Sequence, residues 1–104
     1  MYLISEKDEE LKAYTIRMTE RFYNYAYDYY VNDSYWNIVY RLFNLSPYDF
    51  YHYASYAYGA HYKKSRSIHW FKMFFPDKKN ADAFCKELNR RMSFCVEHKY
   101  FWQI

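Results

Sequence analysis

The stretch from Ser46 to Lys64 constrains the fold most, because it combines a helix start with a dense run of aromatic residues. Ser46 offers an N-cap hydroxyl, Pro47 suits the first helical turn, and Asp49 completes a Ser-x-x-Asp capping box. We therefore predict a helix that begins here and runs to about Lys64. Aromatic rings lie around most of its circumference, so either several elements wrap this helix or it presents tyrosines to a partner.

Aromatic residues are also frequent in the chain as a whole. They make up 27% of the 104 residues, with 16 tyrosines, whereas only one glycine and two prolines are present. A chain of this length forms one hydrophobic core, so we predict a single domain over residues 1–104. Tyrosine has an apolar ring and a polar tip, which suits both a core edge and an interface. A small core has limited room for so many rings, and we expect some of them to contact another macromolecule.

Charge is divided unevenly along the chain. Residues 1–62 carry five Lys or Arg against eight Asp or Glu, a net charge of −3. Residues 63–104 carry ten against four, a net charge of +6. This asymmetry either marks a face that meets an anionic partner or reflects a charged, solvated helix surface.

The first part of the predicted fold, residues 1–64, is helical. Residues 1–5 are interpreted as a short strand or a frayed end. Apolar residues at spacings of three and four then predict a helix from about Lys7 to Tyr30. The stripe of this helix contains Leu11, Thr15, Met18, Phe22, Tyr25 and Tyr29. A second helix is predicted from Tyr35 to Asn44, so three N-terminal helices with short connections are expected to pack as a bundle.

Residues 65–104 are predicted to form a β-α-β unit. The aromatic run Ser67–Phe75 is typical of a strand, and residues 94–104 alternate like a half-buried strand. Between them Asp77 can cap a helix, and the apolar face of that helix contains Ala81, Phe84, Cys85, Leu88 and Met92. The crossover favours parallel strands, and a third strand from residues 1–5 or from a second copy of the chain, as a homodimer, would complete the sheet. The predicted fold is therefore α+β, with three N-terminal helices packed on a C-terminal β-α-β unit.

The sequence lacks the usual motifs for catalysis and for cofactor binding. Gly59 is the only glycine, which excludes glycine-rich phosphate loops and dinucleotide fingerprints. The histidines and cysteines do not stand at metal-ligand spacings, so we predict neither a metal nor a cofactor. We predict that the protein is not an enzyme. A Cys–His nucleophile pair keeps a small enzyme of unknown reaction as an alternative, and Cys85 and His98 are examples of residues that such an enzyme could require.

Several features of the sequence favour a cytoplasmic protein that does not bind membranes. No apolar run approaches the roughly 20 residues needed to span a bilayer, and the acidic start lacks the apolar core of a signal peptide. Cys85 and Cys95 have no paired spacing, which is typical of a reduced, intracellular protein. The residue usage also indicates a low-GC genome, such as that of a Gram-positive bacterium or one of its phages.

Direct binding of DNA or RNA is a second alternative. A helix-turn-helix would place the helix after Ser46 in the major groove, but residues 48–62 contain no Arg, Lys, Asn or Gln to read bases. The basic and aromatic C-terminal half is the better candidate, because Trp70 and Phe74 can stack on bases while lysines contact phosphates. A buried strand would carry the same residues.

The function that we predict is non-enzymatic binding, in which the chain occupies the surface of a macromolecular partner. Tyr, Trp, Phe, Met and Arg are enriched in interface cores, where Lys, Glu and Asp are depleted. We expect a protein partner, for example a host defence or regulatory complex that handles nucleic acid and is inhibited by a phage or mobile-element protein. The predicted partner-binding residues are Tyr51, Tyr58, Tyr62, Lys63, Lys64, Arg66, Trp70 and Lys72.

Overall fold

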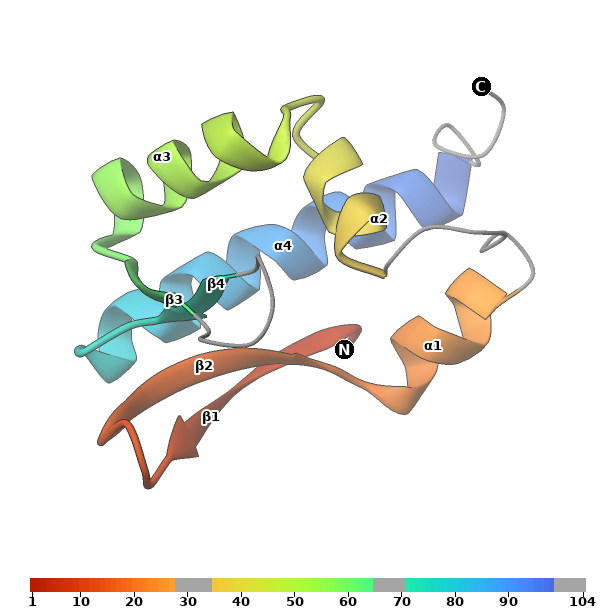
Figure 1. Cartoon of the computed structure of the whole chain (residues 1–104). Helices are drawn as coiled ribbons and strands as arrows, with labels where there is room; N and C mark the ends of the chain where they lie inside the picture. Colours follow the sequence, from red (N-terminus) through yellow and green to blue (C-terminus); the bar gives the residue numbers. More distant parts are fainter. Residues whose placement is uncertain (28–34, 65–70, 99–104) are drawn as a thin grey trace.

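The computed structural model describes residues 1–27, 35–64 and 71–98. Within these ranges the chain forms two antiparallel hairpins and four helices, which confirms the α+β class (Figure 1). In chain order the elements are β1 (Leu3–Asp8), β2 (Ala13–Met18), α1 (Glu20–Tyr27), α2 (Tyr35–Arg41), α3 (Pro47–Tyr58), β3 (His61–Lys64), β4 (Phe71–Phe74) and α4 (Lys78–His98).

The chain begins with a hairpin, so the predicted helix from Lys7 to Tyr30 is wrong. β1 and β2 pair antiparallel, with Leu3 opposite Met18. Along β2 the residues alternate between the two faces: Ile16 and Met18 are buried, whereas Arg17 between them is exposed. This period of two belongs to a strand rather than to a helix. Only α1, which follows the hairpin, is helical in this region, and the predicted bundle of three N-terminal helices is corrected accordingly.

The central helix α3 starts where it was predicted but ends earlier. The N–H of Asp49 donates to the Ser46 hydroxyl at 3.2 Å, which confirms the N-cap. The helix ends at Tyr58 rather than near Lys64, because Gly59 takes the left-handed conformation with φ of 69°. Glycine is the usual residue at this position after a helix, since it has no Cβ to clash. The residues that follow turn away and form β3.

The second half of the chain also differs from its prediction. β3 and β4 form an antiparallel hairpin in which His61 lies opposite Phe74, so the predicted parallel β-α-β unit is wrong. The predicted strand over residues 94–104 is wrong up to residue 98, because α4 continues to His98; the remainder lies outside the described residues. The apolar face predicted for this helix is confirmed, and Cys95 extends it as a buried residue.

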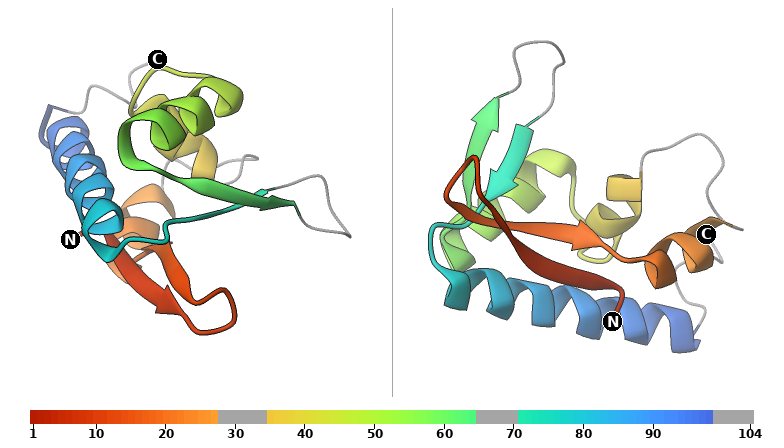
Figure 2. Two further views of the ribbon diagram at one scale, coloured as in Figure 1. Left: turned by 90° about the vertical axis from the view of Figure 1, so that its left-hand side faces the viewer. Right: turned by 90° about the horizontal axis from the view of Figure 1, so that it is seen from below.

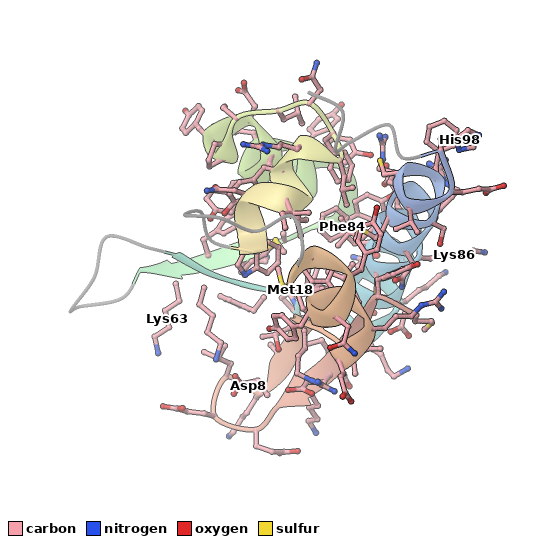
Figure 3. All side chains as sticks on the ribbon, turned by 90° about the vertical axis from the view of Figure 1, so that its right-hand side faces the viewer. Asp8, Met18, Lys63, Phe84, Lys86 and His98 are labelled. Atoms are coloured by element: carbon pink, nitrogen blue, oxygen red, sulfur yellow. The ribbon has the colours of Figure 1, made fainter. Side chains whose placement is uncertain are left out.

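The long helix α4 runs along one side of the molecule and supports the other elements. The β1–β2 hairpin and α3 both pack on it, and the two hairpins lead away from it in different directions (Figure 2). Phe84 points from α4 toward the interior (Figure 3), where its ring centroid lies 5.8 Å from that of Phe50 and 4.9 Å from that of Tyr58. Lys86, two residues further along, is exposed on the outer side of the same helix.

Candidate functional site

A cleft of about 580 Å³ lies between the two hairpins and the first three helices. Most of its lining consists of aromatic and methionine side chains, with charged residues toward its edge. The lining residues are Met18, Tyr23, Trp36, Tyr40, Tyr51 and Met73, together with Glu6, Thr15, Ile16, Arg17 and Lys72. The cleft thus draws its walls from β1, β2, β4, α1, α2 and α3.

The cleft opens because β2 and β4 meet at only one described point. Tyr14 and Phe75 exchange two backbone hydrogen bonds, of 2.9 and 2.7 Å, as an isolated antiparallel bridge. Beyond this bridge the described strands belong to two separate sheets. The left view of Figure 2 shows the hairpins spreading apart, and the cleft lies between the diverging strands.

Three tyrosines form a hydrogen-bonded group beside the cleft, and two of them, Tyr40 and Tyr51, belong to its lining. The hydroxyls of Tyr40 and Tyr51 lie 2.6 Å apart, and the Tyr62 hydroxyl donates to the Tyr51 carbonyl at 2.6 Å. The Tyr51 ring lies 5.8 Å from the Tyr40 ring and 5.0 Å from the Tyr62 ring. Burial raises the pKa of both Tyr40 and Tyr62 well above its usual value, so both hydroxyls stay protonated. The predicted residues Tyr51 and Tyr62 are therefore in contact with each other, and these hydrogen bonds and ring contacts hold their side chains in place.

The edge of the cleft carries two ion pairs. Arg17 Nε lies 2.8 Å from a carboxylate oxygen of Glu6, and Lys72 Nζ lies 2.6 Å from one of Asp8. The hydrogen bond from Lys72 holds the pKa of the Asp8 carboxyl below its usual value. The Lys72 pair joins β4 of one hairpin to β1 of the other. Each cation keeps further N–H donors, and about half of the Arg17 side chain is exposed.

Tyr58 does not line the cleft, because it faces α4. Its hydroxyl donates to Glu87, which also accepts a hydrogen bond from Tyr53 at 2.9 Å and one from Arg91 at 3.1 Å. Burial alone would raise the pKa of the Glu87 carboxyl, but these three donors hold it below its usual value. This network joins α3 to α4. A role for Tyr58 in partner binding stays a prediction.

The predicted basic residues are only partly described. Lys63 is exposed in β3 and lies directly opposite Lys72 in the hairpin. In Figure 3 it extends outward from β3. Lys64 ends β3, but the structure describes nothing of its side chain. Arg66 and Trp70 lie outside the described residues. The structure thus brings Tyr51 and Tyr62 into contact and places Tyr51 and Lys72 at the cleft, whereas Lys63, next to Tyr62 in β3, faces the other side of the hairpin.

Residues of the cleft that sequence reasoning missed lie on the first hairpin and on the first two helices. Met18 and Tyr23 were read as parts of one long helix, and Trp36 and Tyr40 as an ordinary core stripe. The alternation of residues 14–18, in which Thr15 and Arg17 separate apolar neighbours, was the available signal for a strand. No local pattern indicates that this strand, α2 and β4 share a cleft.

A second hollow of about 260 Å³ lies on the outer side of α3. Its lining residues are Tyr48, Tyr51, His52, Ser55 and Tyr62. The rings of Tyr48 and His52 meet edge to face at 4.4 Å, and Tyr48 is exposed. Tyr51 contributes to the lining of both hollows. The exposed rings of α3 therefore continue the aromatic surface beyond the cleft.

The described residues contain no cluster of three metal-ligating side chains. Cys85 and Cys95 are free thiols, and burial raises the pKa of each. Cys85 and His98 lie more than three turns apart on α4, a separation of about 20 Å at 1.5 Å per residue, so these two residues do not form a nucleophile–base pair. No helix in residues 1–27, 35–64 and 71–98 is long and apolar enough to cross a membrane.

Comparison with protein-family models, with curated proteins and with solved structures found no match to this chain. Neither a relative nor a structural neighbour therefore suggests a function. The chemistry of the cleft and of the surfaces beside it is the basis for the proposal that follows.

Proposed function

We propose that this chain is a non-enzymatic binding protein, and that a partner protein docks in the cleft between its two hairpins. The observation that carries the proposal is the lining of the cleft, in which tyrosine, tryptophan and methionine surround a concave space. These residue types are enriched in the cores of protein interfaces, and methionine adapts its shape to a partner.

We further propose a class of partner. The chain would be the product of a phage or other mobile element, and it would inhibit a host defence or regulatory complex that handles nucleic acid. The net charge of +6 in residues 63–104 supports this form, because a positively charged segment is attracted to the nucleic acid that such a complex holds. In this form the chain acts in the cytoplasm of the host cell.

A blocking variant tests the role of the cleft. Thr15 lies on its wall and opposite Glu6 in the hairpin, so Thr15→Arg places a long cation at the cleft and next to a carboxylate that can pair with it. The hairpin is therefore expected to keep its fold. We expect the tagged wild-type protein to capture a discrete partner from a lysate of a low-GC bacterium, and the variant to lose most of that capture.

The matched control is Ser93→Arg, which adds the same charge on the exposed side of α4. This variant is expected to capture the partner as well as the wild type does. Circular dichroism and a thermal melt establish that both variants are folded. Equal capture by wild type and Thr15→Arg would remove the cleft from the interface, and a protein that captures nothing would contradict the binding function itself.

Direct nucleic-acid binding is the second candidate, and one observation favours it. On one face of the β3–β4 hairpin, Lys63 lies opposite Lys72, and beside them the His61 and Phe74 rings stack at 5.6 Å. Cations beside rings are typical of surfaces that bind single strands. This candidate predicts retention on immobilised DNA or RNA that falls steeply between about 50 and 200 mM salt. Absence of retention at the lower salt would contradict it.

A further inference from the structure

The two edges of the β1–β2 hairpin differ in how far other parts of the chain cover them. The outer edge of β1 is covered by α4, where the Asn89 side chain accepts from the Leu3 N–H at 2.8 Å and donates to the Leu3 carbonyl at 2.8 Å. The same side chain accepts from the N–H of Tyr2 at 2.9 Å. Edge strands invite pairing with another chain, and an asparagine that satisfies both backbone groups closes this edge.

The edge of β2 is closed only at its first residues. Tyr14 pairs with Phe75 there, and backbone groups alternate along a strand, so Ile16 and Met18 turn their N–H and C=O groups to the same side as Tyr14. Among the described residues, nothing pairs with these groups. Both residues line the cleft, although they are only 8% and 4% exposed. Backbone groups with so little access to water normally have a partner.

We propose that the cleft binds an extended segment of the partner protein, which adds as a strand to the free edge of β2 at Ile16 and Met18. This inference rests on the proposed function and names the part of the partner that enters the cleft. Addition of a strand satisfies the backbone groups of the edge, while pockets beside it select alternate side chains. The bridge to Phe75 already demonstrates that this edge accepts an antiparallel neighbour.

The surroundings of the edge specify the sequence of that segment. On the core side, its side chains would meet Trp36, Tyr40 and Met73, which favour apolar residues. On the other side they would meet Arg17 and Lys72, both about half exposed. Each cation donates one N–H to a carboxylate of this chain and has further N–H groups available. Opposite charges on neighbouring strands attract. The segment is therefore one in which apolar residues alternate with Asp or Glu.

Selection of short linear peptides from a random displayed library, on the folded full-length protein, supplies the probe. Peptides that bind equally well to a variant with Arg17→Gln and Lys72→Gln are discarded, because that variant lacks the two cations expected to face acidic residues. The remaining peptides are expected to share the alternation of apolar and acidic residues. On addition of such a peptide, the amide protons of Ile16 and Met18 are expected to exchange with solvent more slowly by tenfold or more, because each becomes part of a strand ladder.

A matched pair of peptides separates strand addition from simple burial of side chains. Methylation of the peptide nitrogens that face β2 removes ladder donors and is expected to weaken binding by about tenfold per methyl group. Methylation of the intervening nitrogens, which face away, is expected to change binding much less. Equal losses in the two peptides, or unchanged exchange at Ile16 and Met18, would overturn the inference.

Failure of this inference is distinguishable from failure of the proposed function. If wild type enriches no peptide over the variant with Arg17→Gln and Lys72→Gln, addition of such a strand is overturned, while capture of a folded partner by the cleft still supports the broader function. If the two amides are already protected without peptide, and increasingly so at higher protein concentration, a second copy of the chain occupies the edge and the assignment to a partner protein is overturned.

Discussion

At the scale of single residues, the tyrosines of this chain combine ring packing with specific hydrogen bonds. Tyr51 contacts two other tyrosines and shares a hydrogen bond with each. Tyr53 and Tyr58 converge on one carboxylate. A buried tyrosine usually finds such a partner for its hydroxyl. A small domain can therefore bury a tyrosine ring when its hydroxyl has a hydrogen-bond partner, a requirement that a phenylalanine ring does not have.

The hydroxyl of Tyr62 provides a direct test of this view. Tyr62→Phe removes the donor to the Tyr51 carbonyl and is expected to lower the free energy of unfolding by about 1 kcal/mol. Tyr56→Phe is the matched control, because Tyr56 is 95% exposed and its change is expected to stay within about 0.5 kcal/mol. Urea denaturation measures both. A Tyr62→Phe protein as stable as the control would contradict a structural role for this hydrogen bond.

Gly59 is the residue at which the sequence prediction of α3 failed by about six positions. The N-cap at Ser46 was read correctly because its signal is local. The end was missed because Gly59 lies among helix-compatible residues, and only its φ of 69° identifies it as a C-cap. A single glycine inside a periodic pattern is ambiguous, and the pairing of β3 with β4 decides the outcome.

Substitution of Gly59 tests the cap. Gly59→Ala is expected to lower the free energy of unfolding by about 1 kcal/mol, because a Cβ disfavours the left-handed conformation. The new Cβ would also approach the Asn80 side chain to 3.3 Å. Gly59→Asn is expected to cost less, since asparagine tolerates this conformation. If alanine is tolerated better than asparagine in thermal or urea denaturation, the cap does not have the role assigned to it.

At the scale of elements, a segment was predicted correctly when its residues fit one periodicity, and it was misread when they fit two. The first half of α4 was predicted correctly because Ala81, Phe84 and Leu88 recur at helical spacing with no competing period. The β1–β2 hairpin was misread because Leu11, Thr15 and Met18 also recur at helical spacing. Its turn contains no glycine, and Lys12 takes the left-handed conformation with φ of 53°, so the usual turn signal was missing.

The polar network between α3 and α4 makes a pH-dependent prediction. The folded-state pKa of Glu87 lies below its unfolded value of about 4.3, so its contribution to stability is present above that pH and is lost as pH falls through the folded-state pKa. Glu87→Gln is expected to lower the free energy of unfolding by about 1–2 kcal/mol at pH 7, because hydrogen bonds to a charged acceptor are the stronger ones.

The difference between wild type and Glu87→Gln is expected to shrink as pH falls below about 4.3, because the wild-type carboxyl then becomes neutral as well. Urea denaturation over a range of pH values measures this convergence. Glu97→Gln is the control, since Glu97 is exposed on the same helix. A difference that stays constant down to the lowest pH would contradict an ionised Glu87 in the folded state.

At the scale of the whole molecule, the interior holds more rings than composition alone suggested. Phe50 and Phe84 are fully buried within a cluster of ring contacts that extends through α2, α3 and α4. The exposed large rings of the described residues are Tyr23, Tyr48, Tyr56 and Phe94. Tyr23 lines the cleft and Tyr48 lines the outer hollow of α3. Among the described residues, two of the four exposed rings thus lie at these two hollows, whereas Tyr56 and Phe94 lie elsewhere on α3 and α4.

The candidate site was predictable only in part, because segments far apart in the sequence form it. Tyr51, Tyr62 and Lys72 were identified from composition and spacing, and all three lie at one of the two hollows. Their neighbours on β2 and α2 were not identified, because the cleft arises from two hairpins that meet at one bridge and then diverge. Such an arrangement depends on contacts between distant segments, which no local periodicity encodes.

The most direct test of the account is the affinity of the captured partner for three purified proteins, measured by isothermal titration calorimetry. Wild type and Ser93→Arg are expected to bind it with the same dissociation constant. Thr15→Arg is expected to bind at least about tenfold more weakly, because its side chain occupies the cleft. Equal dissociation constants for all three folded proteins would contradict the cleft as the docking site.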